Sequence, residues 1–252
     1  MTDKPVAMIT GGAGGIGRAC AIRLAQDYDV VITDLDPTVA GAVAHETGSM
    51  GMVCDVGSEQ SVTACVAQIE EQRGPIDLLV TLAGIIQPSH FTPESFPQQS
   101  WDDLFAINSR GTWMCCRAVG ARMIARKRGN IVTIASVMGH RSWSAHAYGP
   151  AKAAVLSMTQ NLAVAWGRSG VRVNSVSPGF TITPKVEALG KSRGKTNDSF
   201  AGETALGRWV LPDEVAEVVA FLASDRASAI TGVDLPVDAG WLPAVSWPTG
   251  RD

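Results

Sequence analysis

Short apolar runs alternate with longer amphipathic segments along most of the chain. The runs are rich in Val and Ile, and one of them, Ile76–Leu82, is almost entirely apolar. A continuous apolar run of this length is typical of a strand that is buried on both faces of a parallel sheet. We expect strands at Val6–Thr10, Val30–Asp34, Met52–Cys54, Ile76–Leu82, Asn130–Ala135, Arg172–Ser177 and Val233–Val237.

The segments between these runs carry apolar residues at helical spacing. We expect helices at Ile16–Gln26, Ser58–Arg73, Ser100–Lys127, Ala145–Arg168 and Pro212–Ala223. Alternation of this kind predicts an α/β protein: a single-domain Rossmann fold over residues 1–252, with a doubly wound, seven-stranded parallel sheet flanked by helices. The segment 183–205 is polar and weakly periodic, so we interpret it as a lid over a substrate.

Composition and charge narrow the class of protein. The chain has 46% hydrophobic and 18% charged residues, which is ordinary for a globular domain. A net charge of −3 gives no reason to expect a nucleic-acid partner. The five cysteines form no C-x-x-C pair and the four histidines lack metal-ligand spacing, so we expect a reducing compartment and no metal.

The N-terminal residues and the lengths of the apolar runs indicate where in the cell the protein is expected. The N-terminus has no apolar core of a signal peptide, and no stretch of about 18 apolar residues occurs. We therefore expect a cytoplasmic protein without a membrane partner.

A glycine-rich loop joins the first predicted strand to the first predicted helix. Its glycines fit two patterns: G-x-G-x-x-G through Gly12, Gly14 and Gly17, and T-G-x-x-x-G-x-G through Thr10, Gly11, Gly15 and Gly17. Between a strand and a helix, such a loop lets the backbone approach a pyrophosphate, which the N–H groups at the helix start then bind.

The second predicted strand ends at Asp34. A carboxylate at this place accepts hydrogen bonds from the adenosine ribose and repels the 2′-phosphate of NADP. The loop Gly11–Gly17 contains no Lys or Arg that would offset this repulsion. Asp34 therefore favours NAD as the cofactor.

Three residues indicate proton-transfer chemistry. Tyr148 and Lys152 are spaced so that they share one helix face. A neighbouring ammonium lowers the pKa of a tyrosine, which then serves as a general acid or base. Ser136 follows the fifth predicted strand, at the sheet edge where ligands of open α/β sheets bind. Ser142 and Ser144 are alternatives to Ser136.

These residues together resemble the short-chain dehydrogenase/reductase family over nearly the whole chain. The family's glycine motif is matched by Thr10, Gly11, Gly15 and Gly17, and its catalytic residues by Asn108, Ser136, Tyr148 and Lys152. The resemblance implies that Tyr148 exchanges a proton with the substrate oxygen, Ser136 orients that oxygen, and Lys152 holds the ribose. It also implies that Asn108 holds a water in a proton relay.

Further positions are similar to the family's cofactor site. Asp55 resembles the aspartate at the adenine, Pro178-Gly179 the motif after the sixth strand, and Thr183 the threonine at the nicotinamide amide. Leu82 stands where the family usually has asparagine. We expect the cofactor to be bound by Gly11, Gly14, Gly15, Ile16, Gly17, Asp34, Asp55, Val56, Ala83, Gly84, Tyr148, Lys152, Pro178, Gly179, Thr181 and Thr183.

The expected function is NAD(H)-dependent interconversion of a secondary alcohol and a ketone, on a small polyol or sugar-like substrate. A 3-oxoacyl thioester reductase and a non-catalytic NAD sensor are the alternatives. The resemblance also implies a homotetramer, with Trp113 and Trp166 as possible interface anchors. We expect His140, His146, Trp143, Trp209 and Trp241 near the substrate, and a basic stretch, Lys185, Lys191, Arg193 and Lys195, in the lid.

Overall fold

A sheet of seven parallel strands forms the centre of the protein. The computed structural model describes residues 4–87, 91–141, 145–184, 186 and 202–244. The strand order is β3-β2-β1-β4-β5-β6-β7, which reverses direction between β1 and β4 as in a doubly wound sheet. The bounds are β1 Val6–Thr10, β2 Asp29–Asp34, β3 Met50–Val53, β4 Ile76–Thr81, β5 Gly129–Ile134, β6 Val171–Pro178 and β7 Asp234–Val237. The predicted fold class is therefore confirmed.

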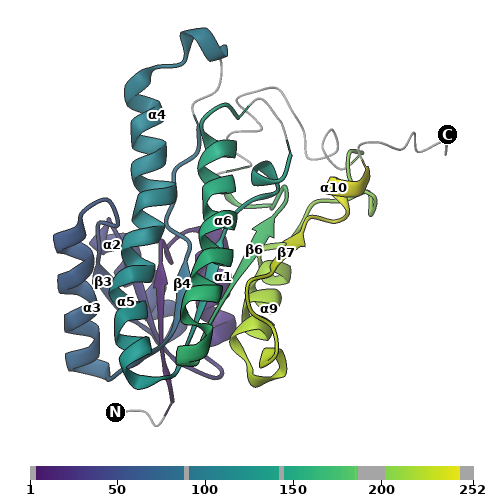
Figure 1. Ribbon diagram of the computed structural model, residues 1–252. Helices are drawn as coiled ribbons and strands as arrows, with labels where there is room; N and C mark the ends of the chain where they lie inside the picture. The colour runs from purple at the N-terminus through teal and green to yellow at the C-terminus, as the bar shows by residue number, and fades with distance from the viewer. Residues whose placement is uncertain (1–3, 88–90, 142–144, 185, 187–201, 245–252) are drawn as a thin grey trace.

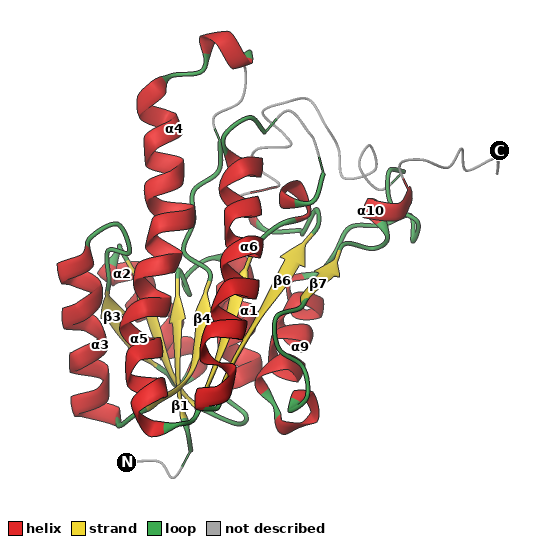
Figure 2. Cartoon of the chain, viewed as in Figure 1, coloured by secondary structure: helices red, strands yellow, loops and turns green. Residues whose placement is uncertain are grey.

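Helices cover both faces of this sheet (Figures 1 and 2). One face carries α1 (Gly15–Leu24), α2 (Pro37–Thr47) and α9 (Pro212–Ala223). The other carries α3 (Glu59–Arg73), α5 (Thr112–Arg126) and α6 (Tyr148–Trp166). The short helix α10 (Trp241–Ala244) follows β7. No helix in the described ranges is both long enough and apolar enough to cross a membrane.

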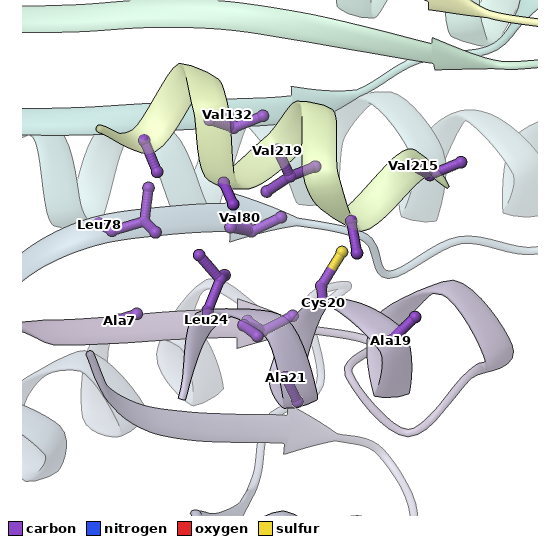
Figure 3. Packing of buried hydrophobic residues seen from close by; sticks show 14 of the residues in the cluster. Ala7, Ala19, Cys20, Ala21, Leu24, Leu78, Val80, Val132, Val215 and Val219 are labelled. Atoms are coloured by element: carbon purple, nitrogen blue, oxygen red, sulfur yellow. The ribbon is translucent and has the colours of Figure 1, made fainter. Parts of the chain in front are cut away.

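The central strands β1 and β4 are largely apolar because both of their faces are buried. In β1, Ala7 and Ile9 enter one core cluster, whereas Val6 and Met8 enter the other. The first cluster joins α1 to α9, with Leu24 and Val219 among its members (Figure 3). Two layers of helices thus hold the sheet, and the ends of its strands are left for a site.

Helix α2 is missing from the sequence prediction, although its boundaries carry clear signals. Asp36 accepts hydrogen bonds from the N–H groups of Thr38 (2.8 Å) and Val39 (3.3 Å), and Pro37 occupies the first turn. Gly48 ends the helix in the left-handed conformation, at φ 66°. These are the usual start and stop signals of a helix. The Ala-rich sequence between them has few large apolar residues to mark a buried face.

The predicted helix Ser100–Lys127 is interrupted. It consists of α4 (Gln98–Phe105), a π-helical turn (Ala106–Gly111) and α5. Such turns are rare and occur mostly as single insertions, frequently at functional sites. Asn108 lies within this one.

Candidate active site

A cavity of about 630 Å³ runs along the carboxyl ends of the strands. Its lining includes Ser136 and every residue that the sequence predicted to bind the cofactor: Gly11, Gly14, Gly15, Ile16, Gly17, Asp34, Asp55, Val56, Ala83, Gly84, Tyr148, Lys152, Pro178, Gly179, Thr181 and Thr183. Asn108 is absent from the lining. The fold thus brings the two predicted ends of the site into one space, while the roles of these residues stay predictions.

The glycines of the loop are required for different reasons. A Cβ on Gly11, whose φ is 64°, would lie 2.5 Å from Cα of Ala83, and one on Gly17 would lie 2.6 Å from Cα of Gly12. Backbone packing therefore excludes side chains at these two positions. Gly14 has an ordinary φ of −73°, and its Cβ would meet no atom closer than the Gly11 oxygen, at 3.6 Å. Neither conformation nor protein packing accounts for this glycine.

The open space at Gly14 fits a pyrophosphate. Gly14 is the N-cap of α1 and supplies no side-chain cap to the helix. A helix start of this kind presents N–H groups and the positive end of the helix dipole, which together bind anions. The residues present therefore fit a dinucleotide cofactor.

Leu82 departs from the family pattern, yet its segment is firmly held. Oγ1 of Thr10 accepts hydrogen bonds from the N–H groups of Leu82 (3.2 Å) and Ala83 (3.3 Å). The Leu82 side chain packs against the core. The threonine of the glycine motif thus fixes the wall opposite Gly11.

The adenosine end of the cavity is acidic. Oδ1 of Asp34 accepts hydrogen bonds from the N–H groups of Leu35 (2.8 Å) and Asp36 (3.4 Å), which orients the carboxylate. Lys152 is the one cation among the described lining residues. Arg18, the first basic residue after the loop, is paired with Glu46. At this end the described lining therefore offers the Asp34 carboxylate and no cation.

Ser136, Tyr148 and Lys152 meet at the opposite end. Ser136 follows β5, and its Oγ accepts a hydrogen bond from the N–H of Met138 (3.2 Å) and also contacts Tyr148. Tyr148 begins α6, so Lys152 lies one turn further on. The Lys152 ammonium donates to the Ile134 carbonyl (2.8 Å) and lies 5.8 Å from the centre of the Tyr148 ring.

Burial dominates the titration of this group. It raises the pKa of Tyr148, and the hydrogen bond with Ser136 acts in the opposite direction. Burial also lowers the pKa of Lys152 to about 8. The expectation that Lys152 depresses the Tyr148 pKa is therefore wrong for this structure. Burial destabilises the phenolate by more than the neighbouring side chains stabilise it, so the pKa rises.

Asn108 holds the segment that follows β4. Its Oδ1 accepts from the N–H of Ile85 (2.8 Å), and its Nδ2 donates to the carbonyl of Ile85 (3.0 Å). Both ends of the carboxamide therefore hold the segment after β4. The role in a proton relay stays a prediction.

Gln87 is a positioning residue that sequence reasoning missed. Its Oε1 accepts hydrogen bonds from the N–H groups of Ala147 (2.8 Å) and Tyr148 (3.2 Å). Ala147, the N-cap of α6, provides no side-chain cap of its own. Gln87 thus caps the helix that carries Tyr148 from 61 residues away, a distance over which no local pattern is informative.

Some predicted neighbours of the substrate lie elsewhere. His140 and His146 line a separate hollow of about 410 Å³. Nε2 of His140 lies 2.8 Å from an oxygen of Asp234. Trp209 lines the main cavity, and Trp241 is buried behind Phe180. Ser142, Trp143, Ser144 and the basic residues Lys185, Lys191, Arg193 and Lys195 fall outside the described residues.

Comparison with known proteins places this site in a family. A family model described as Enoyl-(Acyl carrier protein) reductase matches residues 11–242. D-threitol dehydrogenase of Mycolicibacterium smegmatis is 37% identical over 248 residues, covering 95% of this chain and 93% of the relative. The BbsD subunit of (2S)-[(R)-hydroxy(phenyl)methyl]succinyl-CoA dehydrogenase from Thauera aromatica is 36% identical over 245 residues, covering 93% and 95%.

Solved structures with the same fold are also similar to this chain in sequence. One named ribose-5-phosphate isomerase, from Brucella melitensis 16M, is 48% identical, with a TM-score of 0.94 and coverage of 98% and 95%. A polyketide ketoreductase with NADPH (30%, TM-score 0.91, coverage 95% and 98%) and an NAD⁺-bound xylitol dehydrogenase (28%, 0.87, 94% and 98%) show that both nicotinamide cofactors occur among the neighbours. The glycine loop, the Ser136–Tyr148–Lys152 group and these similarities lead to one assignment: the chain is an oxidoreductase that belongs to the short-chain dehydrogenase/reductase family.

Proposed function

We propose that this protein interconverts a secondary alcohol and a ketone with NAD(H). The observation that carries the proposal is the contact of Ser136 with Tyr148, beside Lys152, in the cavity that the glycine loop also lines. Ser136 orients the substrate oxygen, and the Tyr148 hydroxyl gives or takes its proton. When bound, the nicotinamide accepts or supplies the hydride. Lys152, which carries a positive charge below its pKa of about 8, lies beside Tyr148 and holds the ribose of the cofactor.

The choice of NAD over NADP rests on Asp34. Its oriented carboxylate suits ribose hydroxyls, and the described lining offers no cation for a 2′-phosphate at that end. This choice also disfavours the 3-oxoacyl thioester reductase, because reductive biosynthesis mostly uses NADP. The intact Ser136–Tyr148–Lys152 group weighs against a sensor without turnover.

The isomerase name of the Brucella melitensis structure raises a second activity. A sugar phosphate needs cationic or N–H donors for its charged oxygens. We assign the N–H groups at the start of α1 to the cofactor pyrophosphate, and the one cation among the described lining residues, Lys152, has its ammonium bound to the Ile134 carbonyl. We therefore retain the oxidoreductase.

The test is NADH formation at 340 nm with a panel of secondary alcohols, with NAD and NADP supplied in parallel. Polyols and hydroxyacyl thioesters belong in the panel, because the polyol prediction and its alternative both need them. Turnover with NAD supports the proposal. Turnover with NADP alone contradicts the argument from Asp34, and isomerisation of ribose 5-phosphate without any redox turnover contradicts the reaction class.

Gly14→Ala is expected to weaken cofactor binding without unfolding the protein. The new methyl group meets only the Gly11 oxygen, at 3.6 Å, but occupies the space proposed for the pyrophosphate. We expect at least a tenfold rise in the Kd for NADH, measured by fluorescence titration, and a change in unfolding free energy below about 1 kcal/mol. Gly41→Ala is the control, because its Cβ has no neighbour within 4 Å in α2. Unchanged affinity in Gly14→Ala would remove the pyrophosphate from this place.

Lys152→Met is expected to change how stability depends on pH. The folded pKa of about 8 lies below the ordinary 10.5, so between these values the unfolded chain binds more protons than the folded one. The wild-type protein therefore gains stability relative to Lys152→Met as pH rises from 8 to 10.5, by about 3 kcal/mol in total. Urea unfolding at pH 7, 9 and 10 measures this gain. Parallel curves for the two proteins would show that Lys152 titrates normally.

We also propose that the protein forms a homotetramer in the cytoplasm. Of the two expected anchors, Trp113 on α5 is 40% exposed and available for a subunit contact. Trp166 is instead used within the chain, where its ring packs against Gly120 so closely that a Cβ there would lie 2.6 Å away. Light scattering on the purified protein measures the subunit number.

A further inference from the structure

We propose that the substrate of this enzyme carries an apolar aliphatic or aromatic group next to its reacting carbon, rather than a row of hydroxyls. The inference rests on the proposed function, because it concerns the wall around Ser136 and Tyr148. The described side chains of that wall, apart from the reacting group, are mostly apolar: Ile86, Val137, Met138, Phe180, Val186 and Trp209. We call these six residues the apolar wall.

Fixed contacts hold the apolar wall next to the reacting group. Met138 is bound through its N–H to Oγ of Ser136 (3.2 Å), so it is tied to the residue that orients the substrate oxygen. Phe180 directly follows Gly179, and its carbonyl accepts from the N–H of Val210 (3.0 Å). This hydrogen bond belongs to a β-bridge between Thr181 and Val210.

Contacts between aromatic rings fix part of the apolar wall. The ring of Phe180 packs edge-on against Trp209 (5.9 Å between centroids) and against Trp241 (5.7 Å). Trp209 is 5% exposed and Trp241 is fully buried. A large, preorganised aromatic surface favours an apolar body, because little conformational entropy is lost when that body binds.

The polar side chains of the described lining are already engaged. Asp34 and Asp55 belong to the adenosine end of the predicted cofactor site. Oγ1 of Thr181 donates to the Gly179 carbonyl (3.1 Å), and Oγ1 of Thr183 accepts from the N–H of Val186 (3.3 Å). Ser136 and Tyr148 serve a single substrate oxygen, and Lys152 donates to the Ile134 carbonyl.

The number of hydroxyl groups on the substrate then distinguishes polyols from alcohols that carry an apolar group. Each further hydroxyl of a polyol that is buried without a partner weakens binding by about tenfold or more. Each methylene group buried against an apolar wall strengthens binding by about fourfold. An alcohol with a ring or an alkyl chain is therefore preferred to a polyol of similar size.

The experiment compares 1-phenylethanol with xylitol. We expect kcat/KM with NAD to be at least a hundredfold higher for 1-phenylethanol, and calorimetry on the protein with NAD to show tighter binding of the same compound. A higher kcat/KM or tighter binding for xylitol overturns the inference. Binding of 1-phenylethanol without turnover of any alcohol overturns the proposed function and leaves the apolar wall as a binding surface.

A matched pair of variants locates the effect. Ile86→Thr replaces an apolar side chain of the wall that is 37% exposed, so the fold does not depend on it. We expect kcat/KM for 1-phenylethanol to fall about fivefold while that for xylitol does not fall. Ile22→Thr alters a similarly exposed isoleucine (43%) on α1, outside the cavity lining, and is expected to change neither value. Equal losses for both alcohols in Ile86→Thr would show a general structural effect and overturn the assignment of Ile86.

Discussion

Tyr148→Phe is expected to abolish turnover while cofactor binding persists. The substitution removes one oxygen, the group to which we assign transfer of the substrate proton. Positioned general acids and bases contribute about 10² to 10⁴ in rate, so we expect a loss of kcat/KM in that range. NADH titration and the 340 nm assay on the same preparation separate binding from chemistry.

The chain provides its own control for this substitution. The chain has one other tyrosine, Tyr28, whose hydroxyl donates a hydrogen bond to the Ala223 carbonyl (3.0 Å). This bond connects the residue before β2 to the last residue of α9. Tyr28→Phe is expected to cost about 1 kcal/mol of stability and no activity. Full activity in Tyr148→Phe would mean that another group transfers the proton, and our assignment of Tyr148 would be wrong.

The second large effect concerns the cofactor. Asp34→Ser with Leu35→Arg is expected to reverse the preference from NAD to NADP. Placing a phosphate beside a carboxylate costs several kcal/mol, which corresponds to a ratio of about 10² to 10³ in kcat/KM. The double substitution removes this repulsion and adds a cation. Leu35 is 67% exposed, so an arginine at that position needs no repacking of the core.

The measurement is kcat/KM for both cofactors with one alcohol. Asp36→Ser is the control, because serine retains the N-cap of α2 while removing the neighbouring charge. We expect its cofactor ratio to equal that of the wild type. A wild-type enzyme that prefers NADP, or a double variant that still prefers NAD, would show that Asp34 does not face the ribose.

Local signals in the sequence were enough for the strands and for the two ends of the site. The apolar run Val6–Thr10 and the glycines that follow it lie within a few residues of each other, so a local pattern reveals them. The observed β1 has the predicted bounds. Tyr148 and Lys152 share a helix face through spacing alone. The helix prediction failed where the local signal was weak, as in the Ala-rich α2, and where the backbone departs from the regular helix, as at the π-helical turn Ala106–Gly111.

Residues that are distant in the chain meet only because the sheet brings the ends of its strands together. Gln87 caps Tyr148 from the segment after β4, and the apolar wall collects Ile86, Met138, Phe180 and Trp209 from four separate segments. None of these contacts leaves a periodic or motif-like trace, because hydrogen bonding and packing between segments depend on the whole fold. The sequence by itself determined the fold class and the oxidoreductase family of this protein. The tertiary structure decided what surrounds that chemistry, since the side chains facing the substrate are selected by how the strands and helices pack.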